Sequence, residues 1–350
     1  MNTKNVGMSY KDKITLLSNL STMLTAGISI LETVDSLLED AKGNQKKLLQ
    51  VLREDLIQGK HMYITFSKFP GVFDKVTVNI IKASEEAGSL DVTLKDIKTH
   101  IQKEMEFIDK IRSAMMYPVL IFVVFVLVLI GILVFVIPRM ASVFVRMRLE
   151  LPLPTKILII MSNFITQNTI GLIVGFIVFV ILTMVLYKKN RFIIFAVIFS
   201  IPGISELIKQ MDITRFTRSL ALLLSSGLTI IQALELTENV VLRRDISRLI
   251  KHAKNNLIAG KRLSEGLRSQ KNLFPSMVIK LVEAGEKTGS LDKSLQDVSE
   301  YMDYQVTRTL ETLTTLIEPI MLIMIGFIVG GMMLSIIAPI YGLITQIGTR

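Results

Sequence analysis

The side chains that could do chemistry are few in this chain, and they do not cluster. The sequence contains no cysteine and only three histidines, His61, His100 and His252. Without thiols, disulfides, thiolate catalysis and cysteine-ligated zinc are excluded. None of the histidines has a second histidine or a close carboxylate at the spacing of metal ligands, so we interpret each as a surface or partly buried imidazole.

Short catalytic and nucleotide-binding motifs are also missing from the sequence. It has no Gly-x-x-x-x-Gly-Lys-Ser/Thr phosphate loop, no dinucleotide fingerprint after a strand, no Gly-x-Ser-x-Gly elbow and no His-Glu-x-x-His pair. We therefore predict a protein that is not an enzyme and that binds no cofactor and no metal ion.

Carboxylates do stand out in a segment that occurs twice. Residues 85–97 have the sequence EEAGSLDVTLKDI, and residues 286–298, which begin 201 residues later, have the sequence EKTGSLDKSLQDV. Folding constrains the acids of this segment less than its glycine, serine and leucine. We therefore name Glu85, Glu86 and Glu286 as candidates for contact with a partner protein.

The glycine and serine of the repeated segment predict a corner between two helices. Gly88 is expected to end one helix, because glycine tolerates positive φ, and Ser89 to cap the next. Gly289 and Ser290 repeat this pattern. The positions predicted to set helix corners are Gly27, Gly88, Leu90, Gly227, Gly289 and Leu291.

The duplication extends beyond this segment. Apolar residues around residues 16–24 follow one helical stripe, which indicates an amphipathic helix. Similar segments then pair along the chain: LTAGISILETV (24–34) with LSSGLTIIQAL (224–234), GKHM (59–62) with GKRL (260–263), and MYP (116–118) with IEP (317–319). Each half is thus predicted to be a helical domain that leads into an apolar helix beginning at proline.

Three apolar segments interrupt this pattern, at residues 118–138, 170–187 and 319–341, and the mean hydropathy of the chain is +0.51. They contain no charged residue, as expected for lipid-spanning helices, where one central charge costs about 2.5–3.5 kcal/mol on the insertion scale. The absence of acids, bases and histidine inside them also argues against ion-coupled carriers, proton relays and intramembrane aspartyl proteases.

These segments predict an all-α, polytopic membrane protein with two homologous cytoplasmic helical bundles and three transmembrane helices. Since residues 1–20 have no signal-peptide core, we expect the N-terminus to be cytoplasmic, although basic residues on both sides of the membrane give this orientation mixed support. The expected parts are a first cytoplasmic domain (1–117), a first span (118–138), an outer loop (139–169), a second span (170–187), a second cytoplasmic domain (188–317), a third span (318–341) and a C-terminal tail (342–350).

Small residues in the spans predict close packing between helices. Gly171 and Gly175 in the second span, and Gly326 and Gly330 in the third, have the Gly-x-x-x-Gly spacing that lets helix backbones approach. We expect them to favour helix contact within the chain or in a homo-oligomer. Glu318, at the edge of the third span, is a further candidate for partner contact.

The net charge of +10 is not accompanied by a long Lys/Arg run with interleaved aromatic residues, so we predict no nucleic-acid partner. Basic residues beside anionic lipid explain the excess of positive charge more simply.

Taken in order, these motifs closely resemble those of a known family. The order is a glycine-marked helical hairpin, Gly-Lys, a Glu-x-x-Gly-Ser-Leu corner, Met-Met-Tyr-Pro opening a span, Ile137-Pro138 closing it, LPLPT (151–155), and then a second copy. Over about residues 10 to 345, the chain resembles the inner-membrane platform proteins of type II secretion systems and type IV pilus machines. Longer members have a further segment before the first repeat, whereas in this sequence the repeat begins almost immediately.

The resemblance implies a non-enzymatic hub in the cytoplasmic membrane. Its implied partners are a cytoplasmic hexameric assembly ATPase, pilin or pseudopilin subunits, and other inner-membrane assembly proteins. The alternative is a polytopic transporter or receptor with duplicated cytoplasmic regulatory domains, which would show ligand-dependent flux in liposomes.

Overall fold

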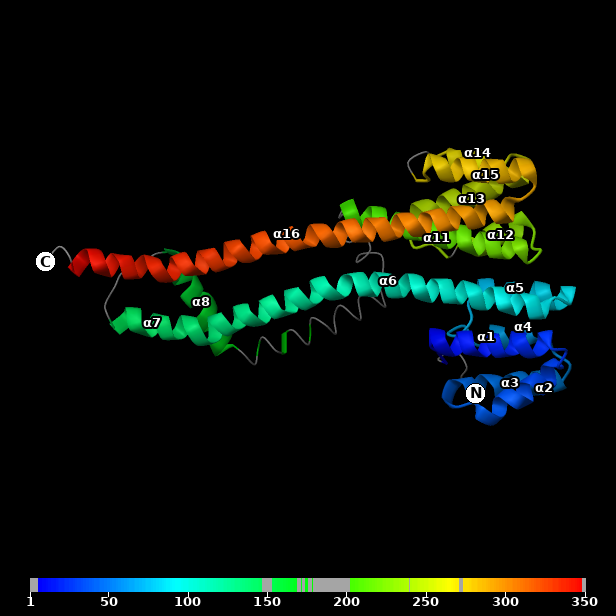
Figure 1. Ribbon diagram of the computed structural model, residues 1–350, viewed down its shortest axis with the longest axis horizontal. Helices are drawn as coiled ribbons and strands as arrows, with labels where there is room; N and C mark the ends of the chain where they lie inside the picture. Colours follow the sequence, from blue (N-terminus) through cyan, green and yellow to red (C-terminus); the bar gives the residue numbers. More distant parts are fainter. Residues whose placement is uncertain are drawn as a thin grey trace. The chain divides into compact units, whose positions relative to one another are not determined.

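The computed structural model describes residues 6–146, 153–168, 171, 174, 175, 178, 202–238, 240–270 and 273–347 (Figure 1). Every regular element in these residues is helical, as expected for the predicted all-α class. The chain divides into two compact units. Unit 1 comprises Met1–Ile111 and Glu206–Arg308, and unit 2 comprises Arg112–Ser205 and Thr309–Arg350.

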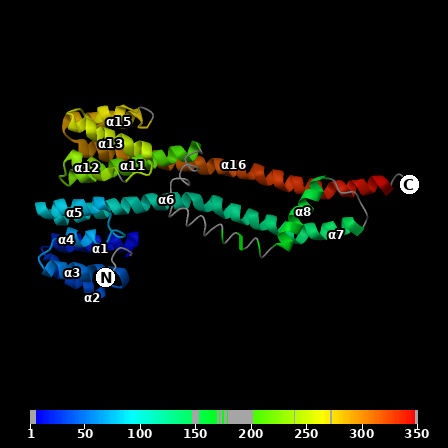
Figure 2. The ribbon, with the colours of Figure 1, turned by 180° about the vertical axis from the view of Figure 1, so that it is seen from behind.

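Unit 1 contains the same succession of helices twice, which we call repeat 1 and repeat 2 (Figure 2). In repeat 1 the helices are α1 (Tyr10–Thr25), α2 (Ile30–Asp40), α3 (Gly43–Ile57), α4 (Met62–Ser67), α5 (Lys75–Ala87) and the start of α6 (Leu90–Gly131). In repeat 2 they are α11 (Pro202–Ser225), α12 (Ile230–Thr237), α13 (Arg244–Ile258), α14 (Leu263–Arg268), α15 (Ser276–Thr288) and the start of α16 (Leu291–Ile347).

Local sequence signals account for where these helices begin and end. The Ser29 and Thr229 side chains accept hydrogen bonds from the third backbone amides of α2 and α12, respectively. Between the first two helices of each repeat, Gly27 and Gly227 have φ of 83° and 84°. This conformation is disfavoured for residues with a Cβ, so glycine can make this turn at low cost.

The core of each repeat is formed by large apolar side chains from facing helices. Leu16, Leu17 and Leu20 of α1 are fully buried, as the helical stripe in the sequence predicts. The Phe66 and Phe73 rings stack in repeat 1 with their centroids 4.1 Å apart. In repeat 2, Phe216 and Phe274 meet edge to face at 6.0 Å. Burial of such side chains is the main stabilising contribution in a helical bundle.

Unit 2 contains the remainder of α6 and α16, together with the π-helix η2 (Ile132–Val136), α7 (Ile137–Arg146) and α8 (Leu153–Gln167). Two helical stretches in the described residues, Leu90–Ser142 and Leu291–Gly331, are long and apolar enough to cross a membrane. The predicted second span, 170–187, lies almost entirely outside the described residues. The predicted outer loop, 139–169, contains most of α7 and all of α8.

The π-helix η2 ends next to a proline that changes the local hydrogen bonding. Pro138 has no backbone N–H, so it cannot donate to a carbonyl one turn earlier. The buried hydroxyl of Ser162, in α8, donates to the Leu133 carbonyl at 2.6 Å. Side-chain hydroxyls are a known means of satisfying backbone groups freed by proline in apolar surroundings.

Candidate functional site

The repeated acids lie at the corners of the two repeats and bind backbone amides. The Glu85 carboxylate accepts hydrogen bonds from the Met62 amide at 2.7 Å and the Tyr63 amide at 3.2 Å, at the start of α4. Glu286 accepts from the Leu263 amide at 2.5 Å and the Ser264 amide at 3.2 Å, at the start of α14. A negative charge at these amides also complements the helix dipole.

This geometry gives the predicted partner-contact acids two different environments. The Glu85 side chain is only 15% exposed, because it faces α4. The Glu86 side chain is 60% exposed and lies 4.0 Å from Lys82. Glu86 therefore offers more of its carboxylate to another protein, and partner contact by all three acids stays a prediction.

The corner glycines adopt the left-handed conformation. Gly88 and Gly289 both have φ of 72° and end α5 and α15. A Cβ added to either would meet no described atom within 4 Å. Backbone conformation, and not lack of space, is therefore what favours glycine at these corners. Leu90 and Leu291, which begin the next helices, are half-buried against the core.

A polar seam joins the two repeats inside unit 1. We define the seam by His100, Lys103, Arg218, Glu300 and Asp303. Lys103 Nζ lies 3.1 Å from a Glu300 carboxylate oxygen. Arg218 and Asp303 form an ion pair within repeat 2, and the Arg218 side chain, in a residue only 5% exposed, lies over the Phe107 ring of α6.

Some buried polar atoms of the seam lack hydrogen-bond partners among the described residues, and a pocket borders the seam. Arg218 Nε, His100 Nδ1 and Asp303 Oδ1 are buried and have no hydrogen-bond partner in the described residues. A cavity of about 550 Å³ borders His100 and Arg218 from one side. The two repeats are thus joined by polar and imperfectly packed contacts, in contrast to their own apolar cores.

The sequence analysis did not identify the Arg218–Asp303 pair. The residues are far apart in the chain and belong to α11 and α16. One signal was available, because Arg218 lies between Phe216 and Leu220, which are at helical spacing, and directly before the apolar run of residues 220–224. An arginine within a buried helical stripe requires a partner for its charge.

A second missed cluster surrounds Asp55 in repeat 1. Its buried carboxylate accepts hydrogen bonds from Lys60 at 3.0 Å, Thr65 at 2.7 Å and Lys68 at 2.5 Å. Burial raises the pKa of Asp55, but the hydrogen bonds from Lys68, Thr65 and Lys60 outweigh this effect and lower the pKa to about 2.

Among the described residues of repeat 2, this charged cluster has no equivalent. At the positions that correspond to Asp55 and Thr65, repeat 2 has Asn256 and Gly266. A Cβ on Gly266 would lie 2.8 Å from the Ala253 Cα, so α14 packs against α13 too closely for a larger residue. The same place in the bundle is therefore held by charges in one copy and by close backbone packing in the other.

In repeat 2, the buried carboxylate of Asp212 holds a connection between two helices through hydrogen bonds to backbone amides. Asp212 is fully buried and accepts hydrogen bonds from the Leu242 amide at 2.9 Å and the Arg243 amide at 2.7 Å. Burial raises its pKa above the usual value, although the two backbone amides act in the opposite direction. This carboxylate fixes the connection that leads into α13.

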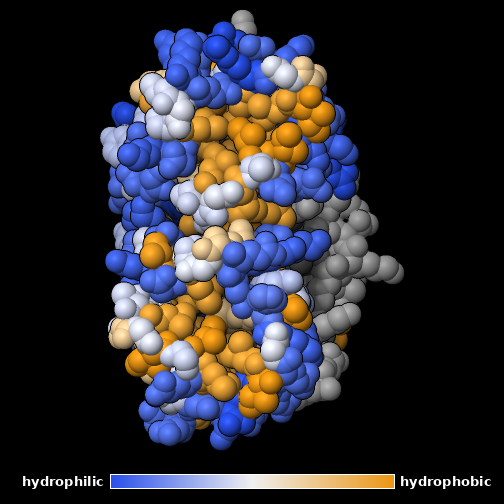
Figure 3. Space-filling view, turned by 90° about the vertical axis from the view of Figure 1, so that its right-hand side faces the viewer, coloured by the Kyte–Doolittle hydropathy of each residue, from blue (hydrophilic) through white to orange (hydrophobic). Residues whose placement is uncertain are grey.

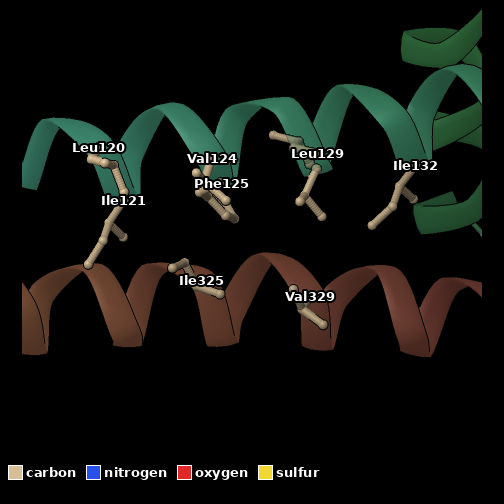
Figure 4. Close-up of a pocket in the computed structure, with 9 residues that line it drawn as sticks. Leu120, Ile121, Val124, Phe125, Leu129, Ile132, Ile325 and Val329 are labelled. Carbon is tan, nitrogen blue, oxygen red and sulfur yellow. The ribbon is translucent and has the colours of Figure 1, made fainter.

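In unit 2, an apolar hollow lies between α6 and α16 (Figure 4). It measures about 290 Å³. Ile121 of α6 and Ile132 of η2 point toward α16, and Ile325 and Val329 face them from that helix. The residues that line the hollow are Leu120, Ile121, Val124, Phe125, Val128, Leu129, Ile132, Ile325 and Val329. It can accept an apolar side chain or an acyl chain.

The predicted packing glycines do not lie at close helix contacts among the described residues. A Cβ on Gly171, Gly175, Gly326 or Gly330 would meet no described atom within 4 Å. Contact between subunits at these positions stays a prediction. Glu318 is exposed on α16 and borders a small hollow together with Tyr117 and Pro118.

Within the described part of the chain, no group of three or more histidine and acidic residues is arranged to hold a metal ion. The residues brought together at the corners and the seam form hydrogen bonds and ion pairs within unit 1. They offer no nucleophile with an adjacent base.

Comparison with known proteins relates this arrangement to a family. The profile described as type II secretion system (T2SS), protein F, matches the chain twice, over residues 16–138 and 216–339. Each match covers one helical repeat and the apolar helix that follows it. This agrees with the duplication found in the sequence.

Individual relatives match along nearly the whole chain. The type IV pilus assembly protein PilC of Thermus thermophilus is 32% identical over 98% of this chain and 85% of its own length. PilC of Myxococcus xanthus is 28% identical over 96% of this chain and 81% of its own length. The type II secretion system protein F of Vibrio cholerae is 24% identical over 95% of this chain and 83% of its own length. This chain, with its duplicated helical repeat and paired apolar helices, belongs to the type II secretion system protein F family.

Proposed function

We propose that the protein is the inner-membrane platform of a type IV pilus or type II secretion machine, where it couples a cytoplasmic assembly ATPase to the insertion of pilin or pseudopilin subunits. The observation that carries this proposal is the duplication: the family profile matches twice, and each match ends in an apolar helix. The PilC and protein F relatives align over nearly the whole chain, which supports a role in the same kind of machine.

The chain is suited to transmitting work and not to generating it. Its sequence has no phosphate-binding loop, so a partner must supply the energy. By linkage, the ATPase must bind alternative arrangements of the platform with different affinities. The polar seam contains unsatisfied buried groups and borders a pocket, and we place the rearrangement there.

We further propose three membrane-spanning helices, at 118–138, 170–187 and 318–341, with both repeats cytoplasmic. The natural absence of cysteine makes this testable without background. Lys47 and Arg248 are exposed at equivalent positions of α3 and α13. Lys47→Cys and Arg248→Cys should both resist a membrane-impermeant maleimide in intact cells and react after permeabilisation. Labelling of one but not the other in intact cells would overturn the topology.

The function is tested by deletion and by co-purification. Deletion of the gene that encodes this protein should abolish surface filaments or secretion while pilin synthesis continues. Full-length protein in detergent should retain an assembly ATPase and hydrolyse no ATP alone. Normal filaments and normal secretion in the deletion strain would refute the proposal, and ligand-dependent flux in liposomes would favour a transporter.

A further inference from the structure

A smaller hollow of about 90 Å³ adjoins the apolar hollow between α6 and α16 in unit 2. Ile121 and Ile325 line both hollows, so the two lie end to end along the helices and form one groove (Figure 4). The smaller hollow is also lined by the polar side chains of Tyr117, Thr314 and Glu318. We call these three residues the polar end of the groove, and the larger hollow its apolar end.

The apolar end has the length of one leaflet of a bilayer. It extends from Ile121 of α6 to Ile132 at the start of η2. At about 1.5 Å per residue, this stretch of helix is about 16 Å long. Half of a hydrocarbon core of ~30 Å is about 15 Å. An acyl chain that begins at the polar end would therefore reach the middle of the bilayer within the groove.

The apolar stretches of α6 and α16 differ from the surface of unit 1. Figure 3, a view onto helices of unit 1, shows hydrophilic residues over much of the surface and hydrophobic residues gathered between them. In unit 2, large apolar side chains such as Leu127 and Phe327 are 63% and 79% exposed. An extended apolar surface of this kind is stable when lipid or protein covers it.

The polar end has a negative charge that its own helices do not balance. Glu318 is exposed and forms no ion pair among the described residues. The sequence has no lysine, arginine or histidine at residues 113–138 or at residues 309–341, which include all the residues that line the groove. A carboxylate beside an apolar groove is most stable next to a positive charge. The charge therefore favours a ligand that places a cation at this end.

The oxygen atoms of the polar end fit a primary ammonium group. Besides the Glu318 carboxylate, the hydroxyl oxygens of Tyr117 and Thr314 can accept hydrogen bonds. The Thr314 hydroxyl donates its own proton to a backbone carbonyl of α16 at 2.9 Å, which leaves its oxygen as an acceptor. A primary ammonium has three N–H donors, and the Tyr117 ring also attracts a cation. A quaternary ammonium has no N–H to donate.

We propose that the groove binds a phospholipid with a primary ammonium headgroup, phosphatidylethanolamine. Its ammonium group lies at Glu318, and one acyl chain lies along the apolar end. Burial of the acyl chain supplies most of the affinity, and the ammonium group supplies the selectivity. The inference rests on the proposed function for the placement of these helices in the membrane, and adds a specific lipid site.

The test measures lipid binding to the full-length protein in detergent by native mass spectrometry. The protein is incubated with equal amounts of phosphatidylethanolamine, phosphatidylcholine and phosphatidylglycerol that have identical acyl chains. Glu318→Gln removes the charge at the polar end. Glu311→Gln is the matched control, because Glu311 is an exposed acid of the same helix that does not line the groove. Unchanged melting temperatures establish that the variants are folded.

The unmodified protein should retain phosphatidylethanolamine at least about fivefold better than either other lipid, because it alone combines a positive charge with N–H donors. Glu318→Gln should reduce this preference to less than about twofold, and Glu311→Gln should leave it unchanged.

A second pair of variants tests the apolar end. Ile325→Phe places a larger side chain in the groove, and Ile323→Phe is the control, because Ile323 is 61% exposed and does not line the groove. Ile325→Phe should lower the retention of phosphatidylethanolamine at least about threefold, and the control should stay within about 1.5-fold of the unmodified protein.

Equal retention of the three lipids by the unmodified protein, or a preference that survives Glu318→Gln, would overturn the lipid site. A change of oligomeric state in Ile325→Phe, measured by light scattering with unchanged lipid retention, would identify a second copy of this chain as the occupant and overturn it too. Normal filaments and normal secretion in the deletion strain, together with a lipid preference that depends on Glu318, would refute the proposed function and leave the lipid site standing.

Discussion

The Glu85 carboxylate accepts a hydrogen bond from the Met62 amide at 2.7 Å, and Glu286 repeats this contact with the Leu263 amide in the second half of the chain. The acid thus closes the corner of each repeat onto the start of the short helix that precedes it. An acid conserved between the two halves has an intramolecular function at both positions.

This contact predicts unequal effects for neighbouring acids. Glu85→Ala and Glu286→Ala should each destabilise the protein by about 1–2 kcal/mol, because each removes a charged cap from two backbone amides. Glu86→Ala is the control, since its side chain is 60% exposed. Melting temperatures should fall by a few degrees for the first two variants and stay unchanged for the third. Equal effects of all three would contradict the capping role.

The Asp55 cluster predicts loss of stability in acid. The pKa of Asp55 in the folded protein is about 2, below its ordinary value of 3.8. Its contribution, about 2 kcal/mol, is therefore present above pH 4 and is lost as the pH falls from about 4 to about 2.

The variant Asp55→Asn, which introduces the residue found at the equivalent position of repeat 2, tests this. It should lower stability at neutral pH and flatten the dependence on pH between about 4 and 2. Denaturation followed by circular dichroism at several pH values measures both effects. An unchanged slope in that range would show that Asp55 is not the group responsible.

The corner glycines predict a graded response to substitution. Because a Cβ at Gly88 would meet no described atom within 4 Å, the cost of a side chain comes from the positive φ alone. Gly88→Ala should cost about 1–2 kcal/mol, and Gly88→Asn less, because asparagine tolerates this conformation better. The same order should hold at Gly289. Ala and Asn variants of equal stability would argue against the backbone explanation.

The Ser162 hydroxyl and Pro138 predict a measurable coupling. Ser162→Ala leaves the buried Leu133 carbonyl without this donor and should destabilise the protein by about 1–3 kcal/mol. Pro138→Ala restores a backbone N–H nearby, so Ser162→Ala should cost less in that background. A double-mutant cycle of thermal stability in detergent measures the difference. Strict additivity would mean that the proline does not create the need for the hydroxyl.

The helical repeats could be predicted from sequence because their signals are local. Leucines at helical spacing are buried, and the glycine at each corner has positive φ, so a single sequence contains the information for both. The duplication of the family match over residues 16–138 and 216–339 confirms the two homologous halves.

Other features could not be predicted from local patterns. Glu85 was named as a candidate for partner contact, which stays a prediction; its hydrogen bond to the start of α4 could not be predicted, because α4 lies earlier in the chain. The Arg218–Asp303 pair joins two helices that only the tertiary fold brings together. The expected outer loop, 139–169, contains α8, which begins at Leu153, and Pro154 lies in its first turn, where a missing N–H is tolerated.

Where repeat 1 has Thr65 beside a charged aspartate, repeat 2 has Gly266 pressed against Ala253. Equivalent positions of the two halves are therefore stabilised by different interactions, and one half cannot simply replace the other. A chimaera built from two first halves would carry the Asp55 cluster twice, and one built from two second halves would not carry it. The two halves of the natural chain are therefore sensitive to different changes. Acid destabilises the first half, and a larger side chain at Gly266 destabilises the second.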